Sequence, residues 1–198
     1  INPHFLYNTL DSIIWMAEGR KYEEVVLMTA SLARLLRQSI SNEDEVVPLA
    51  REVEYAKGYL TIQKMRYKDK LEFEIDVEPS ILNIPLIKLV LQPIIENAIY
   101  HGLKYKESKG LLQVKGFMKD GNAVLQVIDN GVGMDEETLS HIYDKHKVNY
   151  HSNGVGVYNV QKRLKLYYGE NYGITYESEK GVGTTATITI PGIQEESI

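Results

Sequence analysis

The sequence contains no cysteine among its 198 residues. Disulfide bonds and thiolate chemistry are therefore excluded, and the composition fits a reducing compartment. Long apolar runs are also absent: nothing approaches the roughly 20 residues that a membrane-spanning helix needs, and there is neither a basic leader nor a secretory signal. Because the first residue is Ile1 and not a methionine, we expect a fragment of a longer protein whose membrane segments lie upstream.

Several common site motifs are missing as well. The sequence has no G-x-x-x-x-G-K-[ST] phosphate loop, and the pair Gly154 and Gly156 lacks the third glycine of a dinucleotide fingerprint, since residue 159 is Asn. The net charge of -5 argues against a nucleic-acid-binding surface. A metal cage is not indicated either, because the polar stretch richest in histidine lacks cysteine partners and zinc-ligand spacing. We interpret its members as solvated loop residues: His141, His146 and His151.

Helical periodicity dominates the first third of the chain. An apolar stripe at helix spacing follows Pro3, which suits the first turn of a helix. Two further stripes of the same period come before Asp69. The pattern leaves open whether these apolar faces are buried within one chain or shared between two. The three stripes are Leu6, Leu10, Ile13, Ile14 and Ala17, then residues 25–36, then residues 49–60.

Near Lys70 the pattern changes from helical spacing to alternation. Residues 71–77 alternate apolar and acidic side chains, which predicts a half-buried strand. Pro85 is expected to start a helix that runs to about Leu103. The order of elements predicts an α+β protein with two domains, helical residues 1–69 and a mixed α+β unit, residues 70–198. The later elements expected in that unit are a hairpin of strands 112–118 and 123–128 with an Asp-Gly turn, a helix over 156–168, and strands 174–178 and 184–190.

The most informative segment is DNGVGM, residues 129–134. It follows an apolar strand-like run, so Asp129 stands at a strand end with Gly131 and Gly133 just beyond it. Such an arrangement can place one carboxylate in a pocket while the backbone turns tightly under a flat ligand. Ordinary turns have the same composition, because aspartate and glycine are favoured there. The segment alone therefore leaves both interpretations open.

Three companion segments favour the binding site. LQPIIENAIYHG (residues 91–102) precedes DNGVGM, and NGVGVYNV (153–160) and GVGTT (181–185) follow it. In this order the four segments resemble the N, G1, G2 and G3 boxes of the GHKL, or Bergerat-type, ATP-binding superfamily. That superfamily includes DNA gyrase, the ninety-kilodalton heat-shock chaperones, MutL and sensor histidine kinases. The resemblance implies ATP as the cofactor and a sandwich of helices on a mixed sheet for residues 70–198.

The first of these boxes implies a metal ion. The amide of Asn97 would face a Mg²⁺ ion that bridges the ATP phosphates, although an Asn here also suits a polar helix face or a buried hydrogen bond. His101 lies one turn later and would approach phosphate. ATP-hydrolysing relatives usually have a general-base Glu four residues before this Asn, where the present chain has Pro93. This departure argues against simple hydrolysis and for transfer of the phosphoryl group to protein.

The glycine boxes complete the expected nucleotide site. Asp129 would accept the adenine amino group, with Gly131 and Gly133 passing close under the base. Gly154 and Gly156 would offer backbone N–H groups at a helix start to the triphosphate. The segment between the two glycine pairs, residues 135–152, would form a lid. Further ligand contacts are expected from Lys147, Gly183 and Thr184.

The first residues of the chain suggest what the ATP is used for. INPHFLYNTLD, residues 1–11, resembles the phosphoacceptor box of LytS/YesM-like sensor histidine kinases, whose histidine is here His4. Helix geometry places His4, Asn8 and Asp11 on a face away from the first apolar stripe. A neutral imidazole is a ready nucleophile near pH 7. Taken alone, a histidine at this position would be interpreted as a cap or a core residue.

Phe5 stands where the more familiar kinase branch has a proton-accepting acid after the histidine, so Asn8 and Asp11 are the nearest candidates to orient His4. The resemblance implies the cytoplasmic transmitter of a bacterial membrane sensor. It also implies a homodimer in the full-length protein, and a response regulator whose receiver domain takes the phosphoryl group on an Asp. The alternative is a non-catalytic nucleotide-sensing scaffold that signals by conformation, an interpretation that Phe5 favours.

Overall fold

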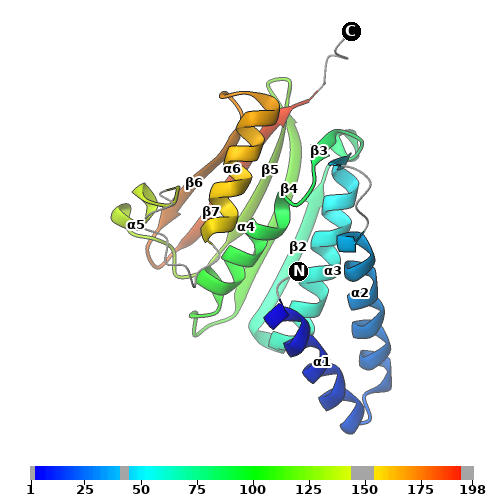
Figure 1. Ribbon diagram of the computed structural model, residues 1–198. Helices are drawn as coiled ribbons and strands as arrows, with labels where there is room; N and C mark the ends of the chain where they lie inside the picture. The colour runs from blue at the N-terminus through cyan, green and yellow to red at the C-terminus, as the bar shows by residue number, and fades with distance from the viewer. Residues whose placement is uncertain (1–2, 41–44, 144–153, 193–198) are drawn as a thin grey trace.

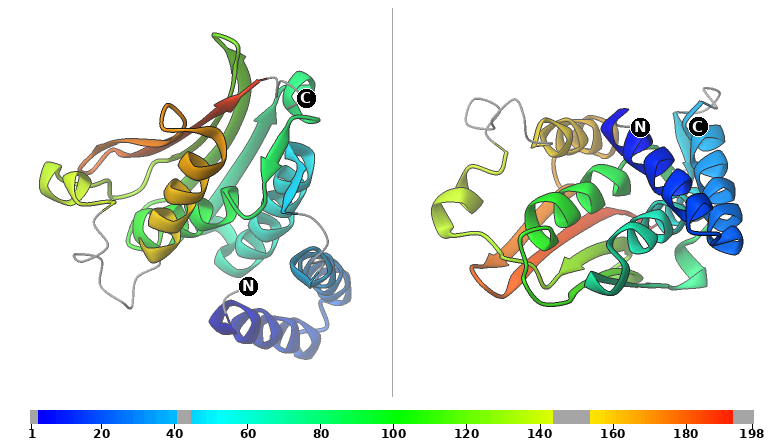
Figure 2. Two further views of the ribbon diagram at one scale, coloured as in Figure 1. Left: turned by 45° about the horizontal axis from the view of Figure 1, so that its top comes forward. Right: turned by 90° about the horizontal axis from the view of Figure 1, so that it is seen from below.

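The computed structural model describes three stretches of the chain: residues 3–40, 45–143 and 154–192. Three helices come first, α1 (Pro3–Glu18), α2 (Tyr22–Ile40) and α3 (Leu49–Tyr67), and a five-stranded sheet follows (Figure 1). The views in Figure 2 show α3 between the α1–α2 pair and the sheet. In the described part of the chain, no helix combines the length and apolarity needed to cross a membrane.

The sheet has the strand order β2-β4-β5-β7-β6. Its first pair, β2 (Leu71–Val77) and β4 (Gly110–Lys119), is parallel and the other pairs are antiparallel, so the predicted mixed sheet is confirmed. The β4–β5 hairpin turns at Asp120 and Gly121, which both have positive φ, as an Asp-Gly pair predicts. The other strands are β5 (Asn122–Asp129), β6 (Gly173–Glu179) and β7 (Gly183–Pro191).

Two short strands join the helical part of the chain to the rest. β1 (Val46–Pro48) pairs antiparallel with β3 (Pro85–Ile87). The prediction that Pro85 starts a helix is therefore wrong. The fixed φ of proline suits extended backbone as well as the first turn of a helix, and the sequence around Pro85 does not distinguish the two.

The helix after β3 changes its hydrogen-bonding pattern along its length. It begins as α4 (Leu91–Asn97) and continues as the π-helical segment η3 (Ala98–Leu103). The remaining helices are the 3₁₀ turns η1 (Lys68–Lys70) and η2 (Pro79–Ile81), the short α5 (Glu136–Ser140) and α6 (Gly154–Tyr168).

One apolar core extends from α1 to β7, because α3, α4 and α6 cover the same face of the sheet (Figure 2). The predicted α+β architecture, helices followed by a helix-covered mixed sheet, is confirmed. Asp69, where we placed a domain boundary, lies in η1. However, α3 packs on both sides of that boundary, against α1 and α2 and against α4 and β2.

The buried face of α1 differs from the predicted stripe. Phe5, Thr9 and Met16 face the core, whereas Leu10 is exposed. Phe5 stacks on Tyr59 of α3 with ring centroids 4.9 Å apart, and the Thr9 hydroxyl donates to the Phe5 carbonyl, which allows it to be buried. Two apolar sets overlap on this helix, and periodicity alone does not tell which one meets α3. The exposed apolar residues of α1 are Tyr7, Leu10, Ile14 and Trp15.

Candidate functional site

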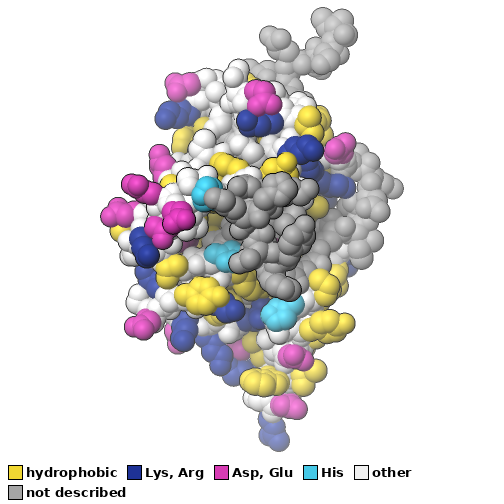
Figure 3. Space-filling model, turned by 60° about the vertical axis from the view of Figure 1, so that its left-hand side comes forward, with side chains coloured by type: hydrophobic (Ala, Val, Ile, Leu, Met, Phe, Trp, Pro, Cys, Tyr) yellow, Lys and Arg dark blue, Asp and Glu magenta, His cyan; other side chains and the backbone are white. Residues whose placement is uncertain are grey.

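A cavity of about 550 Å³ opens between the α4–η3 helix and the strands β5 and β7. Five of the predicted nucleotide-site residues line it, although they lie far apart in sequence: Asn97, His101, Asp129, Gly133 and Thr184. Residues of α5 close one side of the cavity. Figure 3 shows this face of the molecule, with acidic side chains gathered at the left of the view. The volume is typical of a pocket for a small organic ligand.

Asp129 forms the polar part of the cavity floor at the end of β5. Its side chain is only 6% exposed, and its Oδ1 atom accepts the N–H of Gly131 at 2.8 Å. Burial raises the pKa of the carboxyl group to about 6, although backbone hydrogen bonds from Gly131 and Thr184 and the nearby charge of Lys106 oppose this rise. The carboxylate therefore has acceptor capacity left for a ligand that enters the cavity.

The glycines around Asp129 are places where another backbone segment approaches closely. A Cβ on Gly131 would lie 2.4 Å from the carbonyl carbon of Gly102, and one on Gly133 would lie 1.9 Å from the carbonyl oxygen of Glu179. A Cβ on Gly183 would lie 2.0 Å from the carbonyl oxygen of Asp129. Gly133 also lines the cavity. These glycines let backbone segments close around Asp129, and the passage of Gly131 and Gly133 under a base stays a prediction.

Replacement of Gly183 by alanine should lower the free energy of unfolding by roughly 2–4 kcal/mol, because the new Cβ clashes with backbone and φ is +145°. Gly181→Ala is the matched control in the same hairpin. Its φ is +83° but nothing lies within 4 Å of the added carbon, so a loss of about 1–2 kcal/mol is expected. Urea denaturation of both variants measures the difference; equal losses would show that the close approach to Asp129 is unimportant.

Asn97 and His101 lie on opposite sides of the change from α-helix to π-helix, and both face the cavity. The Oδ1 atom of Asn97 is buried, and within the described residues it has no hydrogen-bond partner. A buried acceptor without a partner is unfavourable unless a ligand satisfies it. Partial burial and the charge of Lys104 lower the pKa of His101, which favours its neutral form at pH 7.

The orphaned amide oxygen of Asn97 fits a Mg²⁺ ion, which prefers oxygen ligands. Across residues 3–40, 45–143 and 154–192, no group of three or more His, Cys, Asp or Glu side chains could hold a metal ion. An ion at Asn97 would therefore need further oxygens from phosphate and water. This is how Mg²⁺ is usually held beside a nucleotide.

Helix α6 begins at Gly154, whereas we expected it to follow Gly156, so both glycines lie in its first turn and do not precede it. A Cβ on Gly156 would lie 3.3 Å from the Cβ of Pro93. Gly156 thus allows α6 to pack closely on α4, at the position where hydrolysing relatives were expected to have a catalytic Glu. Lys147, the predicted lid contact, lies outside the described residues.

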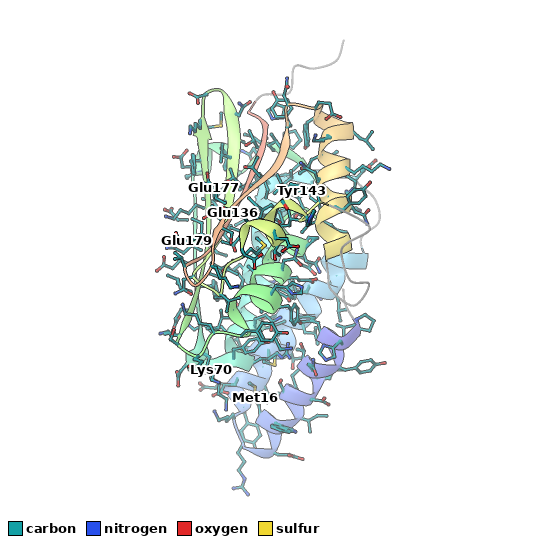
Figure 4. All side chains as sticks on the ribbon, turned by 90° about the vertical axis from the view of Figure 1, so that its left-hand side faces the viewer. Met16, Lys70, Glu136, Tyr143, Glu177 and Glu179 are labelled. Carbon is teal, nitrogen blue, oxygen red and sulfur yellow. The ribbon has the colours of Figure 1, made fainter. Side chains whose placement is uncertain are left out.

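Residues of α5 belong to the segment expected to form a lid, whereas sequence reasoning missed the part of the cavity that comes from β6. Tyr176 of β6 lines the cavity, and Tyr143 meets it edge-on with ring centroids 6.0 Å apart. The Tyr143 hydroxyl donates to the carbonyl of Ile174, which ties the segment after α5 to β6. Figure 4 shows Tyr143 on the α5 side, in front of the sheet. No sequence motif marks these residues, because their place depends on which strand becomes the edge of the sheet.

His4 is exposed near the start of α1, as predicted. The Asn8 side-chain amide nitrogen lies 3.1 Å from both ring nitrogens of His4. Asp11 is exposed, but seven residues along an α-helix correspond to about 10 Å along the axis, so Asn8 is the nearer partner. Phe5, which stands where another kinase branch is expected to have an acid, is 1% exposed and anchors α1 on α3.

The fold is that of a GHKL-type ATP-binding domain with a helical region before it. It has a helical layer, a mixed sheet and a cavity with a buried carboxylate at its base. Residues 83–194 match the family described as histidine kinase-, DNA gyrase B-, and HSP90-like ATPase, and residues 1–71 match the family described as histidine kinase. The chain belongs to these families, and within them to the LytS/YesM-like sensor histidine kinases.

Two curated relatives support this placement. Sensor histidine kinase YesM of Bacillus subtilis is 36% identical over 191 residues, which are 96% of this chain and 32% of that protein. Sensor protein LytS of Oceanobacillus iheyensis is 33% identical over 176 residues, which are 86% of this chain and 30% of that protein. The chain thus spans about a third of the length of these relatives.

Solved structures share the fold at lower identity. The histidine kinase domain from the Erythrobacter litoralis EL346 blue-light activated histidine kinase has a TM-score of 0.54 and 16% identity, covering 88% of this chain and 82% of that one. The catalytic domain of histidine kinase ThkA has a TM-score of 0.56 and 16% identity, covering 75% of this chain and 99% of that one.

Proposed function

We propose that the chain is the cytoplasmic transmitter of a bacterial membrane sensor, which phosphorylates His4 with Mg²⁺-ATP and passes the phosphoryl group to an Asp of a response regulator. The observation that carries this proposal is that one chain combines an exposed histidine on an anchored helix with a cavity that has a buried carboxylate and an orphaned amide oxygen. Family membership supports it.

Each site residue has a task in this proposal. The carboxylate of Asp129 accepts the adenine amino group, and Thr184 and His101 stand further along the cavity wall. Mg²⁺, when bound, would neutralise phosphate charge, and the amide oxygen of Asn97 is the group present to hold it. A backbone cradle for the phosphates is assigned to the first turn of α6, at Gly154 and Gly156. Lys147 keeps its predicted role as a phosphate contact.

The transfer step uses the imidazole of His4 as the nucleophile. A ring nitrogen bonds to the γ-phosphorus, the bond from that phosphorus to the bridging oxygen breaks, and ADP leaves with the electron pair. The proton on the other ring nitrogen is then released. Asn8 orients the ring through its amide, which lies within hydrogen-bond distance of it. Phe5 holds the helix through its buried contact with Tyr59, and it takes no part in proton transfer because its side chain has no group that accepts a proton.

A homodimer fits the surface of the helical region. α1 exposes the apolar side chains of Tyr7, Leu10, Ile14 and Trp15, and α2 exposes three more. A second copy that covered them would bury apolar area now in contact with water. On α2 these residues are Tyr22, Val26 and Leu27.

Labelling with γ-phosphate-labelled ATP distinguishes the kinase from a scaffold that signals by conformation. Phosphate on a histidine is acid-labile and alkali-stable, so label with this behaviour is the expected result. ATP binding without any such label, in the chain extended to its upstream sensor, would favour the scaffold.

Asn97→Ala is predicted to weaken the Mg²⁺-dependent part of ATP binding by roughly ten- to a hundredfold, since it removes an oxygen that would contact a charged group. The affinity for ATP in the presence of a chelator should change much less. Isothermal titration with and without Mg²⁺ measures both values. Equal losses under the two conditions would instead indicate a structural role for Asn97.

A further inference from the structure

The start of α4 lacks a capping side chain of its own. The residues before and at its first turn are Leu89, Val90 and Leu91, whose side chains offer no oxygen to the free backbone N–H groups. Val90 and Leu91 are at most 1% exposed, so water cannot take the place of a cap. Buried N–H groups without a partner are rare in proteins, and another element must supply an acceptor.

Glu52 of α3 supplies that acceptor from 37 residues earlier in the chain. Its Oε1 atom accepts the N–H of Leu89 at 2.8 Å, and its Oε2 atom accepts those of Val90 and Leu91 at 2.9 and 3.0 Å. Leu89 has a positive φ of 63°. The N–H groups of three consecutive residues, Leu89 to Leu91, therefore all donate to the same carboxylate. Glu52 is only 6% exposed.

A second charged residue holds the same segment from the other side. The Nη2 atom of Arg163, on α6, donates to the carbonyl of Lys88 at 2.8 Å. The guanidinium and the three N–H groups lower the pKa of Glu52, whereas burial raises it and is the larger effect. Residues 88–91 are therefore held by α3 and α6 together, and Glu52 makes most of the contacts.

The contacts of Glu52 and Arg163 with residues 88–91 matter because α4, which starts there, carries Asn97. Leu91 and Asn97 are separated by about 9 Å along the helix axis, so a tilt of about 10° at the first turn would move Asn97 by roughly 1.5 Å. Mg²⁺ requires near-ideal geometry with ligands about 2.0–2.1 Å away. A displacement of that size would remove Asn97 from the coordination sphere, whereas Asp129, on the sheet, would stay in place.

We propose that Glu52 is a positioning residue for the metal–nucleotide site: from α3 it fixes the first turn of α4 and thereby the amide oxygen of Asn97. Glu52 itself touches neither nucleotide nor metal, and the inference rests on the proposed function. It makes α3, which also packs on α1 through Phe5 and Tyr59, the element that sets the geometry of the metal ligand.

Calorimetric titration of ATP with Mg²⁺ and with a chelator, on the full chain, tests the role of Glu52. Glu52→Ala should weaken Mg²⁺-ATP binding by about 10–100-fold, the range for residues that support a metal ligand from outside its coordination sphere, and should change metal-free ATP binding far less. Glu52→Gln should fall between wild type and Glu52→Ala, since it keeps one acceptor oxygen but turns an NH₂ group toward backbone N–H groups. Glu54→Gln, an exposed position on the same helix, should match wild type.

A destabilising control separates positioning from stability. Leu35→Ala removes a fully buried side chain of α2 and should lower the melting temperature while preserving the ratio of the two affinities. A change of that ratio in Leu35→Ala as large as in the Glu52 variants would overturn the inference, as would equal losses with and without Mg²⁺ in Glu52→Ala. If Glu52→Ala does not fold, Glu52→Gln carries the same test. Wild-type protein that binds no ATP would instead refute the proposed function.

Discussion

Replacement of His4 by glutamine is expected to abolish the acid-labile phosphate label while ATP affinity stays unchanged. His4 is exposed on α1, and glutamine keeps a polar side chain there without a nucleophilic ring nitrogen. The neighbouring anchor, Phe5 against Tyr59, is not altered, so α1 should remain docked. Labelling followed by acid and alkali treatment measures the acceptor, and calorimetry measures the affinity.

The matched control for this variant is His141→Gln. His141, which we expected to be a solvated loop residue, is half-buried and lines the nucleotide cavity, as does His101, so it is close enough to compete as an acceptor. This variant should still take up label at His4. Label that survives in His4→Gln but disappears in His141→Gln would move the acceptor to the cavity and refute the assignment of His4.

Asp129→Ala should weaken ATP binding by about 1.5–3 kcal/mol, or roughly ten- to a hundredfold, because it would remove the proposed charge-assisted hydrogen bond to adenine. GTP should compete poorly with ATP for the wild-type protein, since guanine has a carbonyl where adenine has the amino group. Calorimetry gives both values. An unchanged ATP affinity in Asp129→Ala would rule out this carboxylate as the adenine acceptor.

The same residue predicts a pH dependence with a definite sign. Its pKa is raised from 3.8 to about 6 by burial, so between these values the folded protein binds a proton that the unfolded chain has released. The free energy of unfolding should therefore fall as pH rises from about 4 to 6, by up to about 3 kcal/mol, and Asp129→Asn should remove this slope. Adenosine, which has no phosphate to titrate, should bind more tightly above pH 6, where the carboxylate is ionised.

The sequence predicted those elements that are determined by residues close together in the chain. The Asp-Gly pair fixed the β4–β5 hairpin, alternation fixed β2, and the aspartate at the end of an apolar run lies at the end of β5, in the cavity. These features depend on a few neighbouring residues, and the strand period of two is unambiguous there.

Features that depend on distant partners were not predictable in this way. The strand at Pro85 exists because Val46–Pro48 pairs with it, and α4 begins where it does because Glu52 reaches its first N–H groups. The buried side of α1 is decided by Tyr59. The backbone atoms that leave no room for a Cβ at Gly131, Gly133 and Gly183 belong to segments distant in sequence, so no local pattern predicts these close approaches.

The exposed face of α1 carries a tryptophan whose intrinsic fluorescence can report on binding at this face. Trp15 is the only tryptophan in the sequence, and 77% of it is exposed on the helix that carries His4. Its emission therefore comes from one known place and starts from the red-shifted maximum of an indole in water. Any protein that covers this face, whether a second copy or a receiver domain, shifts that emission to the blue, so assembly can be followed by fluorescence without attaching a dye.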